Sequence, residues 1–351
     1  MDGQSCLLHN TREKIALISR RIVLLGKTGV GKSSLANTIM GEDVFSVCHS
    51  SISERSLSRL ETKCVNGRNI SLIDTCSVFD TCTSGTLLRD EIVRCITMCA
   101  PGPHAFLIVL KVEKFTQQEQ DVIKKIWQYF SEDAMKYAAV IFTHGDQLPE
   151  GMKIEDFVSQ NNELKNLVAK CGGRCHVIDN KYWKNNEEND YRSNQFQVAE
   201  ILRTVDKITE ANNGSCYTNE MLQKINSEMQ VEEEHIRQSS ANMSQEEIRD
   251  KAKTLLVNKL LIIFAGTATG VLLGAFLGVA KMVTSTVINL NEHSGVNELV
   301  STTSGRATLA LAAQNGLVQG GRLGYAAAEE AGSPQEAIQK AAKAVLDHAA
   351  K

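Results

Sequence analysis

A glycine-rich segment near the start of the chain, residues 26–33 (GKTGVGKS), fits the pattern G-x-x-x-x-G-K-[ST]. In such a loop the glycines let the backbone bend, so that several N–H groups and the positive end of the following helix face a phosphate. The amine of Lys32 would neutralise β- and γ-phosphate oxygens, and the hydroxyl of Ser33 would ligate Mg²⁺. Because the segment lies between a predicted strand and a predicted helix, it favours a nucleoside triphosphate site over a glycine-rich turn that binds nothing.

A second polar motif, residues 143–146 (THGD), directly follows another predicted buried strand. An ionised Asp146 at that place would accept hydrogen bonds from both N1–H and the exocyclic amine of guanine, a donor pair that adenine lacks. The ring of His144 can stack on the base. An aspartate after a strand is also a common helix cap, so the motif alone is a weak signal. Its place several strand–helix units after the phosphate loop indicates a guanine nucleotide.

Short β-branched runs alternate with amphipathic stretches between residues 19 and 213. This alternation predicts an α/β fold with a doubly wound, mainly parallel sheet and helices on both faces. The predicted strands are residues 21–25, 71–74, 105–111, 138–143 and 175–178. The predicted helices are residues 32–40, 87–98, 117–130, 154–169 and 195–209. Asn66 and Gly67 between two strand-like runs are a hairpin signal, so we expect one antiparallel pair at an edge of the sheet.

The composition of the 351 residues is that of a globular protein, with 42% hydrophobic residues, 23% charged residues and a formal net charge of −3. These values exclude a wholly disordered chain, and the near-neutral balance argues against a dedicated nucleic-acid-binding protein. The ten cysteines form no C-x-x-C pair, and no basic-then-apolar leader opens the sequence. We therefore expect free thiols in a reducing compartment rather than disulfides or a zinc site.

Residues 214–259 are predicted to form a polar helical extension, in which Ser244 and Glu247 make a capping box that opens a helix. Residues 260–280 then carry no charge. As one helix they would span about 30 Å, the thickness of a bilayer core. Every fourth residue is a glycine, at positions 266, 270, 274 and 278, which is typical of a face that another helix approaches closely. We expect a transmembrane helix that self-associates; the alternative is a buried helix of a soluble fold.

More basic residues precede this apolar segment than follow it closely. The asymmetry predicts that the nucleotide-binding domain lies in the cytosol, at the cytoplasmic face of an intracellular membrane. The tail, residues 281–351, is rich in alanine and glycine and ends in a predicted helix capped at residues 333–336.

Four segments together resemble the GTPases of immunity-associated proteins. They are GKTGVGKSS at residues 26–34, GPHAFLIVLKVEKFTQQEQ at 102–120, FTHGD at 142–146 and RCHVIDNK at 174–181. The resemblance extends over residues 21–213. It implies a Ras-like guanine-nucleotide domain, related to septins and dynamin-like proteins, followed by a helical extension and in some members by a hydrophobic membrane segment. It also implies dimerisation through the nucleotide face when GTP is bound, and very slow hydrolysis in some members.

Matched position by position, the resemblance implies a set of site residues for GTP or GDP and Mg²⁺. The metal would be held by Ser33 directly and by Asp74 through water. The nucleotide-binding set is Gly26, Lys27, Thr28, Gly29, Val30, Gly31, Lys32, Ser33, Ser34, Thr143, His144, Asp146 and Asn180. Ahead of Asn180, where the family has Phe-Asn, this chain has Ile178 and Asp179.

Three positions depart from the family pattern where switching and catalysis are expected. Ser77 stands in place of the glycine of the DTPG motif, and Arg55 stands in the first switch segment where a threonine closes on Mg²⁺. Ser53 or Ser56 would supply that hydroxyl only if the segment shifts register. Lys114, a weak candidate for a catalytic residue, replaces an arginine and cannot form the two parallel hydrogen bonds of a guanidinium. We expect intact nucleotide binding with weak or absent hydrolysis.

Three functions remain open from the sequence. The first is a membrane-tethered guanine-nucleotide switch or scaffold that forms a homodimer or homo-oligomer. The second is a competent GTPase in which Ser77 and Lys114 are tolerated replacements. The third is a membrane interaction protein, attached through residues 260–280, with a relic nucleotide domain. The nucleotide released from the purified, denatured protein separates the three.

Overall fold

The computed structural model describes residues 19–47, 58–75, 85–113, 117–185, 190–239, 243–265, 267 and 269–292. The chain divides into two compact units. Unit 1 consists of Met1–Cys82 with Pro101–Thr218, and unit 2 consists of Thr83–Ala100 with Asn219–Lys351. The division differs from a boundary drawn along the sequence, because unit 2 includes a helix from the middle of the predicted nucleotide-binding domain.

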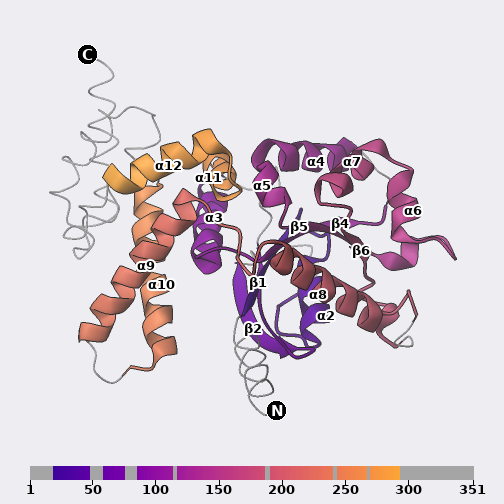
Figure 1. Ribbon diagram of the computed structural model, residues 1–351, viewed down its shortest axis with the longest axis horizontal. Coiled ribbons are helices and arrows are strands. Elements are labelled where there is room, and N and C mark those ends of the chain that lie inside the picture. Colours follow the sequence, from indigo (N-terminus) through magenta and orange to yellow (C-terminus); the bar gives the residue numbers. More distant parts are fainter. Residues whose placement is uncertain are drawn as a thin grey trace, which may run out of the picture. The chain divides into compact units, whose positions relative to one another are not determined.

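Unit 1 is built on a mixed sheet whose strand order is β2-β3-β1-β4-β5-β6 in the described part of the chain (Figure 1). The strands are β1 (Arg20–Leu25), β2 (Arg59–Val65), β3 (Arg68–Asp74), β4 (Ala105–Lys111), β5 (Ala138–Thr143) and β6 (Cys175–Val177). All neighbouring strands run parallel except β2 and β3. This arrangement is a Ras-like P-loop fold, and it confirms the predicted α/β class.

The hairpin predicted at the sheet edge is present. Asn66 and Gly67 have φ angles of 48° and 74°, and Val65 pairs with Arg68 across the turn. A two-residue turn whose backbone twist matches that of the strands needs positive φ at both positions, and asparagine and glycine adopt it at the least cost. The local sequence therefore sets the register of β2 against β3.

Helices cover both faces of this sheet, as Figure 1 shows. They are α2 (Lys32–Met40), α4 (Gln117–Tyr129), α5 (Glu132–Met135), α6 (Ile154–Ser159), α7 (Asn162–Lys170) and α8 (Asn194–Ala211). One core cluster joins α2 and α8 to the sheet, with Leu35, Leu107 and Ile201 fully buried in it. Strands β4 and β5 are buried along nearly their whole length, which explains their unbroken apolar sequences.

One predicted helix, residues 154–169, is two helices in the structure. Asn161 has an extended backbone (φ −129°), and its side-chain oxygen accepts hydrogen bonds from the amides of Glu163 and Leu164. The side chain of asparagine forms hydrogen bonds with nearby backbone amides that would otherwise bond within the helix. Asparagine therefore favours a helix cap over a helix interior. The prediction of a single helix over residues 154–169 was wrong for that reason.

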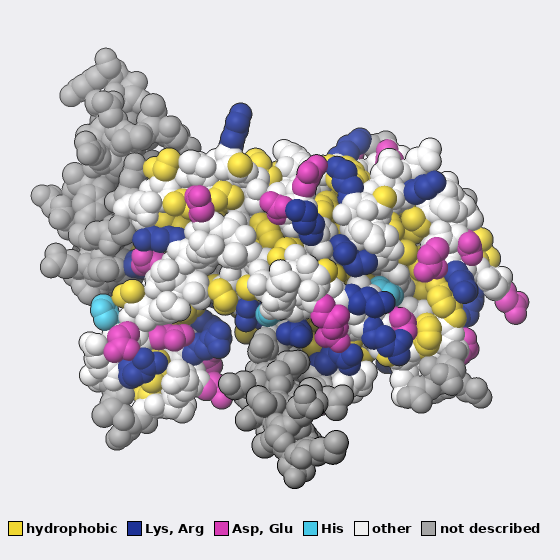
Figure 2. Space-filling view, viewed as in Figure 1, with side chains coloured by type: hydrophobic (Ala, Val, Ile, Leu, Met, Phe, Trp, Pro, Cys, Tyr) yellow, Lys and Arg dark blue, Asp and Glu magenta, His cyan; other side chains and the backbone are white. Residues whose placement is uncertain are grey.

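Over α8, on the face of unit 1 that Figure 2 shows, charges of both signs are interspersed. Lys and Arg side chains lie near Asp and Glu side chains there. There Asp206 pairs with Arg68 at 2.6 Å and with Arg20 at 3.8 Å. Such exposed or half-buried pairs contribute little to stability.

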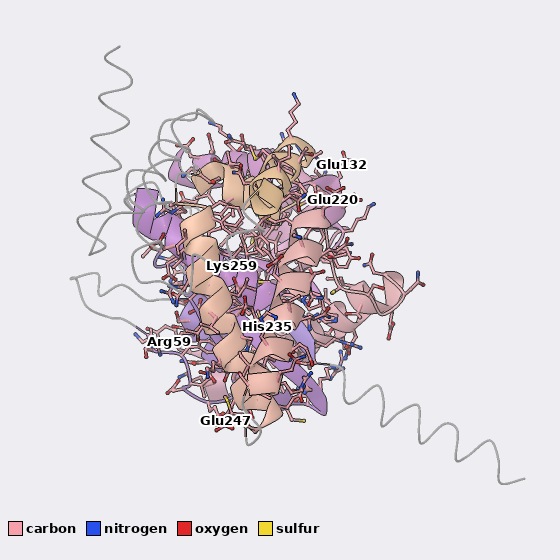
Figure 3. The ribbon with its side chains drawn as sticks, turned by 90° about the vertical axis from the view of Figure 1, so that its left-hand side faces the viewer. Arg59, Glu132, Glu220, His235, Glu247 and Lys259 are labelled. Atoms are coloured by element: carbon pink, nitrogen blue, oxygen red, sulfur yellow. The ribbon has the colours of Figure 1, made fainter. Side chains whose placement is uncertain are left out.

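Unit 2 is helical. Its helices are α3 (Gly85–Cys99), α9 (Glu220–Ser239), α10 (Gln245–Ile263), α11 (Thr269–Phe276) and α12 (Ala280–Glu292). Helices α9 and α10 lie side by side (Figure 3), and α3 packs against α9, α10 and α11. The predicted capping box is confirmed, since the amide of Ser244 donates to Glu247 Oε2 at 2.8 Å and the Glu247 amide donates back to Ser244 Oγ at 3.2 Å.

A buried lysine links the two long helices of unit 2. Lys259 of α10, labelled in Figure 3, has a side chain only 5% exposed, and its Nζ lies 2.7 Å from a carboxylate oxygen of Glu228 on α9. Glu232, one turn further along α9, lies at 4.0 Å. Ion pairs this far from water constrain geometry more than they add net stability, so the pair fixes how α10 lies along α9.

The apolar segment 260–280 is not one helix, which corrects the sequence-based expectation. Helix α10 ends at Ile263, α11 is a separate helix, and α12 begins at Ala280 after Gly278 turns with φ 89°. In the described residues no single helix has the length and apolarity to cross a membrane, although Gly270–Phe276 and Ala280–Asn291, bent by 102°, meet that test as a pair.

Glycine in this segment serves packing within the unit. A Cβ built on Gly274 of α11 would overlap Sδ of Met282 on α12. Most apolar side chains of α11, including Leu272 and Phe276, are buried, whereas Val271 is half-buried. At Gly274 the small-residue face is therefore occupied by the same chain. The predicted helix capped at residues 333–336 lies outside the described residues.

Candidate nucleotide site

The phosphate loop connects β1 to α2 and depends on its glycines. Gly29 and Gly31 have φ angles of 75° and 88°, a region that other residues rarely adopt. A Cβ on Gly26 would lie 2.6 Å from the carbonyl oxygen of Val109 on β4, so this glycine lets the loop approach the sheet. The loop thus places the first amides of α2 at the carboxyl end of the sheet, where ligands of such folds bind.

The lysine of the loop is held in place by the loop itself. Lys32 is 8% exposed, and its Nζ donates hydrogen bonds of 3.0 Å to the carbonyl oxygens of Gly26 and Lys27. Its charge therefore lies beside the backbone of the loop rather than in solvent. A phosphate bound to those amides would meet a pre-positioned cation.

The hydroxyl and carboxylate proposed for the metal lie together. Ser33 Oγ donates to Asp74 Oδ2 at 2.5 Å, and Asp74 is 5% exposed. Burial raises the pKa of Asp74, although the hydrogen bond from Ser33 and the charges of Lys32 and Arg59 oppose the rise. Its other oxygen, Oδ1, is buried and has no hydrogen-bond partner among the residues that the structure describes.

These atoms fit a magnesium ion. Mg²⁺ prefers hard oxygen ligands, takes one or two from the protein and keeps water on the rest. A cation beside Asp74 would compensate the buried oxygen and favour the ionised carboxylate. The evidence for this fit is that Ser33 and Asp74 offer oxygen ligands and that Oδ1 of Asp74 is buried without a partner among the described residues. Both residues were named from the sequence.

The base motif is tied to the phosphate loop. Thr143 is fully buried, and its hydroxyl donates to the carbonyl oxygen of Val30 at 2.6 Å. His144 follows in the left-handed region (φ 60°), with Nδ1 3.0 Å from the Thr143 hydroxyl. Two motifs distant in sequence therefore share one hydrogen-bonded framework.

Asp146 lies half-exposed just beyond this framework. Partial burial raises its pKa, and a hydrogen bond with the carboxyl of Asp179 adds to the rise. Gln147 Nε2 donates to Asp146 Oδ2 at 2.7 Å, and this hydrogen bond opposes the rise in the pKa of Asp146. The carboxylate is thus accessible for a ligand and already oriented by two neighbours.

Asn180 joins the last motif to the phosphate loop. Its Oδ1 accepts from the hydroxyl of Thr38 at 3.0 Å, and its Nδ2 lies 3.5 Å from the carbonyl oxygen of Gly31. A cavity of about 1270 Å³ opens beside Asn180, lined also by Ser34, Thr38, Lys181, the loop after α2 and part of β2. Its lining includes neither Lys32 and Ser33 nor Asp146, so this cavity adjoins the phosphate and base motifs and does not enclose them.

Asp179 is a site residue that the sequence showed only as a departure from the family pattern. Its Oδ1 accepts from the amides of Lys181 and Tyr182 at 2.8 and 2.5 Å, and its Oδ2 accepts from the amide of Asp146 at 3.2 Å. Burial alone would raise the pKa of Asp179, but these hydrogen bonds outweigh it and hold the pKa below its usual range. An aspartate directly after a buried strand was the available signal.

The model of the AIG1 family matches residues 20–236. The chain belongs to the AIG1 family. Immune-associated nucleotide-binding protein 8 of Arabidopsis thaliana is 34% identical over 212 residues, covering 59% of this chain and 58% of that protein. GTPase IMAP family member 8 of Homo sapiens is 30% identical over 219 residues, covering 62% of this chain and 30% of that protein.

The resemblance seen in the sequence is thereby confirmed, and the chain spans less than two thirds of the length of these two AIG1 relatives. Among solved structures, Toc33 from Arabidopsis thaliana in complex with GDP and Mg²⁺ is similar. Its TM-score is 0.46 at 18% sequence identity, covering 62% of this chain and 95% of that one.

Three residues named from the sequence in the phosphate loop of this AIG1 domain contact α4 or are exposed. Lys27 extends to α4, where its Nζ lies 3.2 Å from Glu119. Thr28 and Gly29 are exposed at the tip of the loop. The three departures, Arg55, Ser77 and Lys114, lie outside the described residues.

The cysteines described in this AIG1 chain form no metal site. No group of three or more His, Cys, Asp and Glu side chains suited to a metal occurs in the described ranges. Cys171 and Cys175 are buried free thiols, and burial raises the pKa of each to about 12. Thiols with such pKa values are poor nucleophiles and poor metal ligands.

Proposed function

We propose that the chain binds GTP and GDP with Mg²⁺ at this site and acts as a guanine-nucleotide switch or scaffold with weak or absent hydrolysis. The observation that carries the proposal is the contact of Ser33 with Asp74 beside Lys32, with one buried oxygen of Asp74 unpaired among the described residues. The hydroxyl and the amine at the start of α2, with the carboxylate at the end of β3, form a receptor for a metal-bound phosphate.

Each group has a defined part in binding. The amides at the start of α2 donate to the β-phosphate, and the amine of Lys32 neutralises its oxygens. The carboxylate of Asp146 accepts from N1–H and the exocyclic amine of guanine, while Thr143 holds that loop to the phosphate loop. Ser33 and Asp74 would hold Mg²⁺, which when bound neutralises charge that develops between the β- and γ-phosphates.

Nucleotide released from the purified, denatured chain and calorimetric titration with GTP and GDP test this proposal. Lys32→Ala should weaken binding about 100-fold, because a charged hydrogen-bonding partner of the phosphates is lost. Lys124→Ala is the matched control, since Lys124 is an exposed lysine on α4 whose ion pair with Asp121, at 3.3 Å, lies within the same helix. If the wild-type chain neither retains nor binds guanine nucleotide, the switch is excluded, and the function that remains is the membrane interaction protein with a relic nucleotide domain.

Weak hydrolysis follows from the three altered positions. Loss of one preorganised stabilising donor costs about 10²–10³ in rate. Single-turnover hydrolysis should therefore be slow in the wild type and faster in a variant carrying Arg55→Thr, Ser77→Gly and Lys114→Arg. If the wild type already matches the repaired variant, the chain is a competent GTPase and the departures are neutral.

GTP-dependent homodimerisation through the nucleotide face is part of the same proposal, and it is supported by the family resemblance. Sedimentation with Mg²⁺ and a non-hydrolysable GTP analogue should show a dimer, whereas GDP should leave a monomer. Lys32→Ala should abolish the difference, because it removes the nucleotide rather than the interface. A sedimentation coefficient that is the same with the GTP analogue and with GDP contradicts the proposed GTP-dependent dimerisation.

Attachment to the cytoplasmic face of an intracellular membrane is proposed through the bent pair α11–α12. The support is the apolarity of the pair and the exposed Ile288 on α12, 49% accessible. Ile288→Glu should reduce flotation of the full chain with phospholipid vesicles, and Val231→Glu on α9, at a similarly exposed residue, is the control. A full chain that fails to float contradicts the attachment; release at alkaline pH contradicts a spanning mode.

A further inference from the structure

We infer that Asp179 is a positioning residue that sets base selectivity, because its buried carboxylate holds the loop of Asp146 to the loop of Asn180. This inference rests on the proposed guanine-nucleotide function. It adds a residue that does not itself need to touch the base and that acts through Asp146.

The contacts of Asp179 connect two separate loops. Its side chain, in a residue only 2% exposed, accepts from the amide of Asp146 on one side and from the amides of Lys181 and Tyr182 on the other. One carboxylate therefore fixes where the backbone of Asp146 begins and how the chain after Asn180 turns. Three amide donors also keep this carboxylate ionised.

The backbone of Asp179 is fixed as firmly as its side chain. The amide of Asp179 donates to Asn194 Oδ1 at 3.2 Å, and Asn194 Nδ2 donates to the carbonyl oxygen of Asp179 at 2.6 Å. Asn194 is 7% exposed and begins α8. The positioning carboxylate is thus anchored to a helix of the core, which makes the loops a rigid reader of the base.

A carboxylate at this place has a consequence that a neutral side chain would not have. Asp146 faces Asp179 from the neighbouring loop, with Lys181 beyond it, and His144 and Gln147 from its own loop. The two carboxyls share a hydrogen bond, so a proton taken up on acidification goes to Asp146 and is donated to Asp179. A protonated Asp146 accepts one donor of guanine less well, so guanine binding should weaken on the acid side.

The experiment compares GDP with inosine diphosphate, which lacks the exocyclic amine. Affinities are measured by calorimetry for the full-length wild type, Asp179→Ala, Asp179→Asn and the control Asp156→Asn, from about pH 4.5 to 7.5. Asp156 is an exposed carboxylate of α6 that also accepts a backbone amide, from Lys153 at 3.2 Å. Circular dichroism confirms folding of each variant.

The wild type should prefer GDP over inosine diphosphate by about 10- to 100-fold, the value of a hydrogen bond to a charged group. Asp179→Ala should reduce that ratio to within about threefold. Asp179→Asn should move the acid midpoint of GDP binding to lower pH, because the like charge beside Asp146 is gone. Asp156→Asn should match the wild type. A general loss of structure would lower both affinities without changing the ratio or the midpoint.

The outcomes separate this inference from the function on which it rests. If the wild type binds GDP selectively while neither Asp179 variant changes the ratio or the midpoint, Asp179 has no positioning role and the proposed function stands. If Asp179→Ala does not fold, the acid midpoint of GDP binding to Asp179→Asn decides whether Asp179 has this role. A wild type that binds no guanine nucleotide overturns the function and the inference together.

Discussion

The indole of Trp183 lies so close to the backbone of Gly145 that a Cβ built on residue 145 would be 2.5 Å from Cη2 of the ring. Trp183 is 4% exposed, and the amide of Gly145 donates to the carbonyl oxygen of Ile178 at 3.1 Å. The glycine of the base motif is therefore required by packing between two loops.

Gly145→Ala should destabilise unit 1 by about 1–3 kcal/mol, because a rigid buried ring has no room to yield. It should also weaken GDP binding, since displacement of Trp183 moves the loop that carries Asp146. Urea unfolding and calorimetry measure the two effects.

Trp183→Leu in the same chain is the control for that substitution. Leucine leaves space for the new methyl group, so the double variant should lose less stability than the sum of the two single variants. Strict additivity would show that the contact between residues 145 and 183 is not what the alanine disturbs.

Removal of Mg²⁺ should separate Asp74 from an ordinary buried carboxylate. Chelation should weaken GTP binding to the wild type about tenfold or more, and Asp74→Asn should bind weakly whether or not the ion is present. Asp121→Asn on α4 should behave as the wild type does. Equal sensitivity of Asp74→Asn and the wild type to chelation would remove Asp74 from the metal site.

His104 should make unit 1 sensitive to acid. Burial, and then the charges of Arg21 and Arg20, lower the pKa of His104 to about 3, and its Nδ1 accepts from the amide of Arg21 at 3.0 Å. Between that pKa and the ordinary value near 6.5, the unfolded chain binds a proton that the folded chain does not. The contribution of His104 to stability is therefore complete above about pH 6.5 and declines as the pH falls, by about 2 kcal/mol at pH 5.

His104→Asn should remove this part of the decline, because an amide oxygen accepts the same hydrogen bond without titrating. The part due to His176, whose pKa burial lowers to about 4, should remain. His235→Asn, at the exposed histidine labelled in Figure 3, should leave the decline unchanged. Urea titrations at several pH values provide the comparison, and parallel curves for all three chains would exclude His104 as the source.

Gly274→Leu should destabilise unit 2 by about 1–3 kcal/mol, because the new side chain would occupy the place of Met282. Met282→Ala in the same chain should recover part of the loss by vacating that space. Helical signal during thermal unfolding is the readout. A variant of unchanged stability that instead loses crosslinking between copies would favour the continuous, self-associating helix.

Much of unit 1 was predictable because its signals are local. The buried strands β4 and β5 are unbroken apolar runs, and the turn at Asn66 and Gly67 is set by their own backbone preferences. The phosphate loop is equally local, since its glycines are needed where they stand in sequence. These features require no knowledge of distant residues.

The features that sequence reasoning missed depend on distant residues. The role of Asp179 comes from amides on two loops, and the grouping of α3 with the C-terminal helices comes from contacts across more than a hundred positions. The break at Asn161 reflects a competition between capping and helical periodicity that a periodic pattern does not decide.

The corner at Gly278 has a thermodynamic consequence for the segment 260–280. Leu272 and Phe276 are already buried in the protein interior. The lipid bilayer and the protein interior therefore compete to bury the same side chains. Any transfer of these side chains to a bilayer is then linked to the opening of unit 2. Mutations or denaturants that loosen the helical unit should raise the partition coefficient into vesicles, and ligands that tighten it should lower that coefficient.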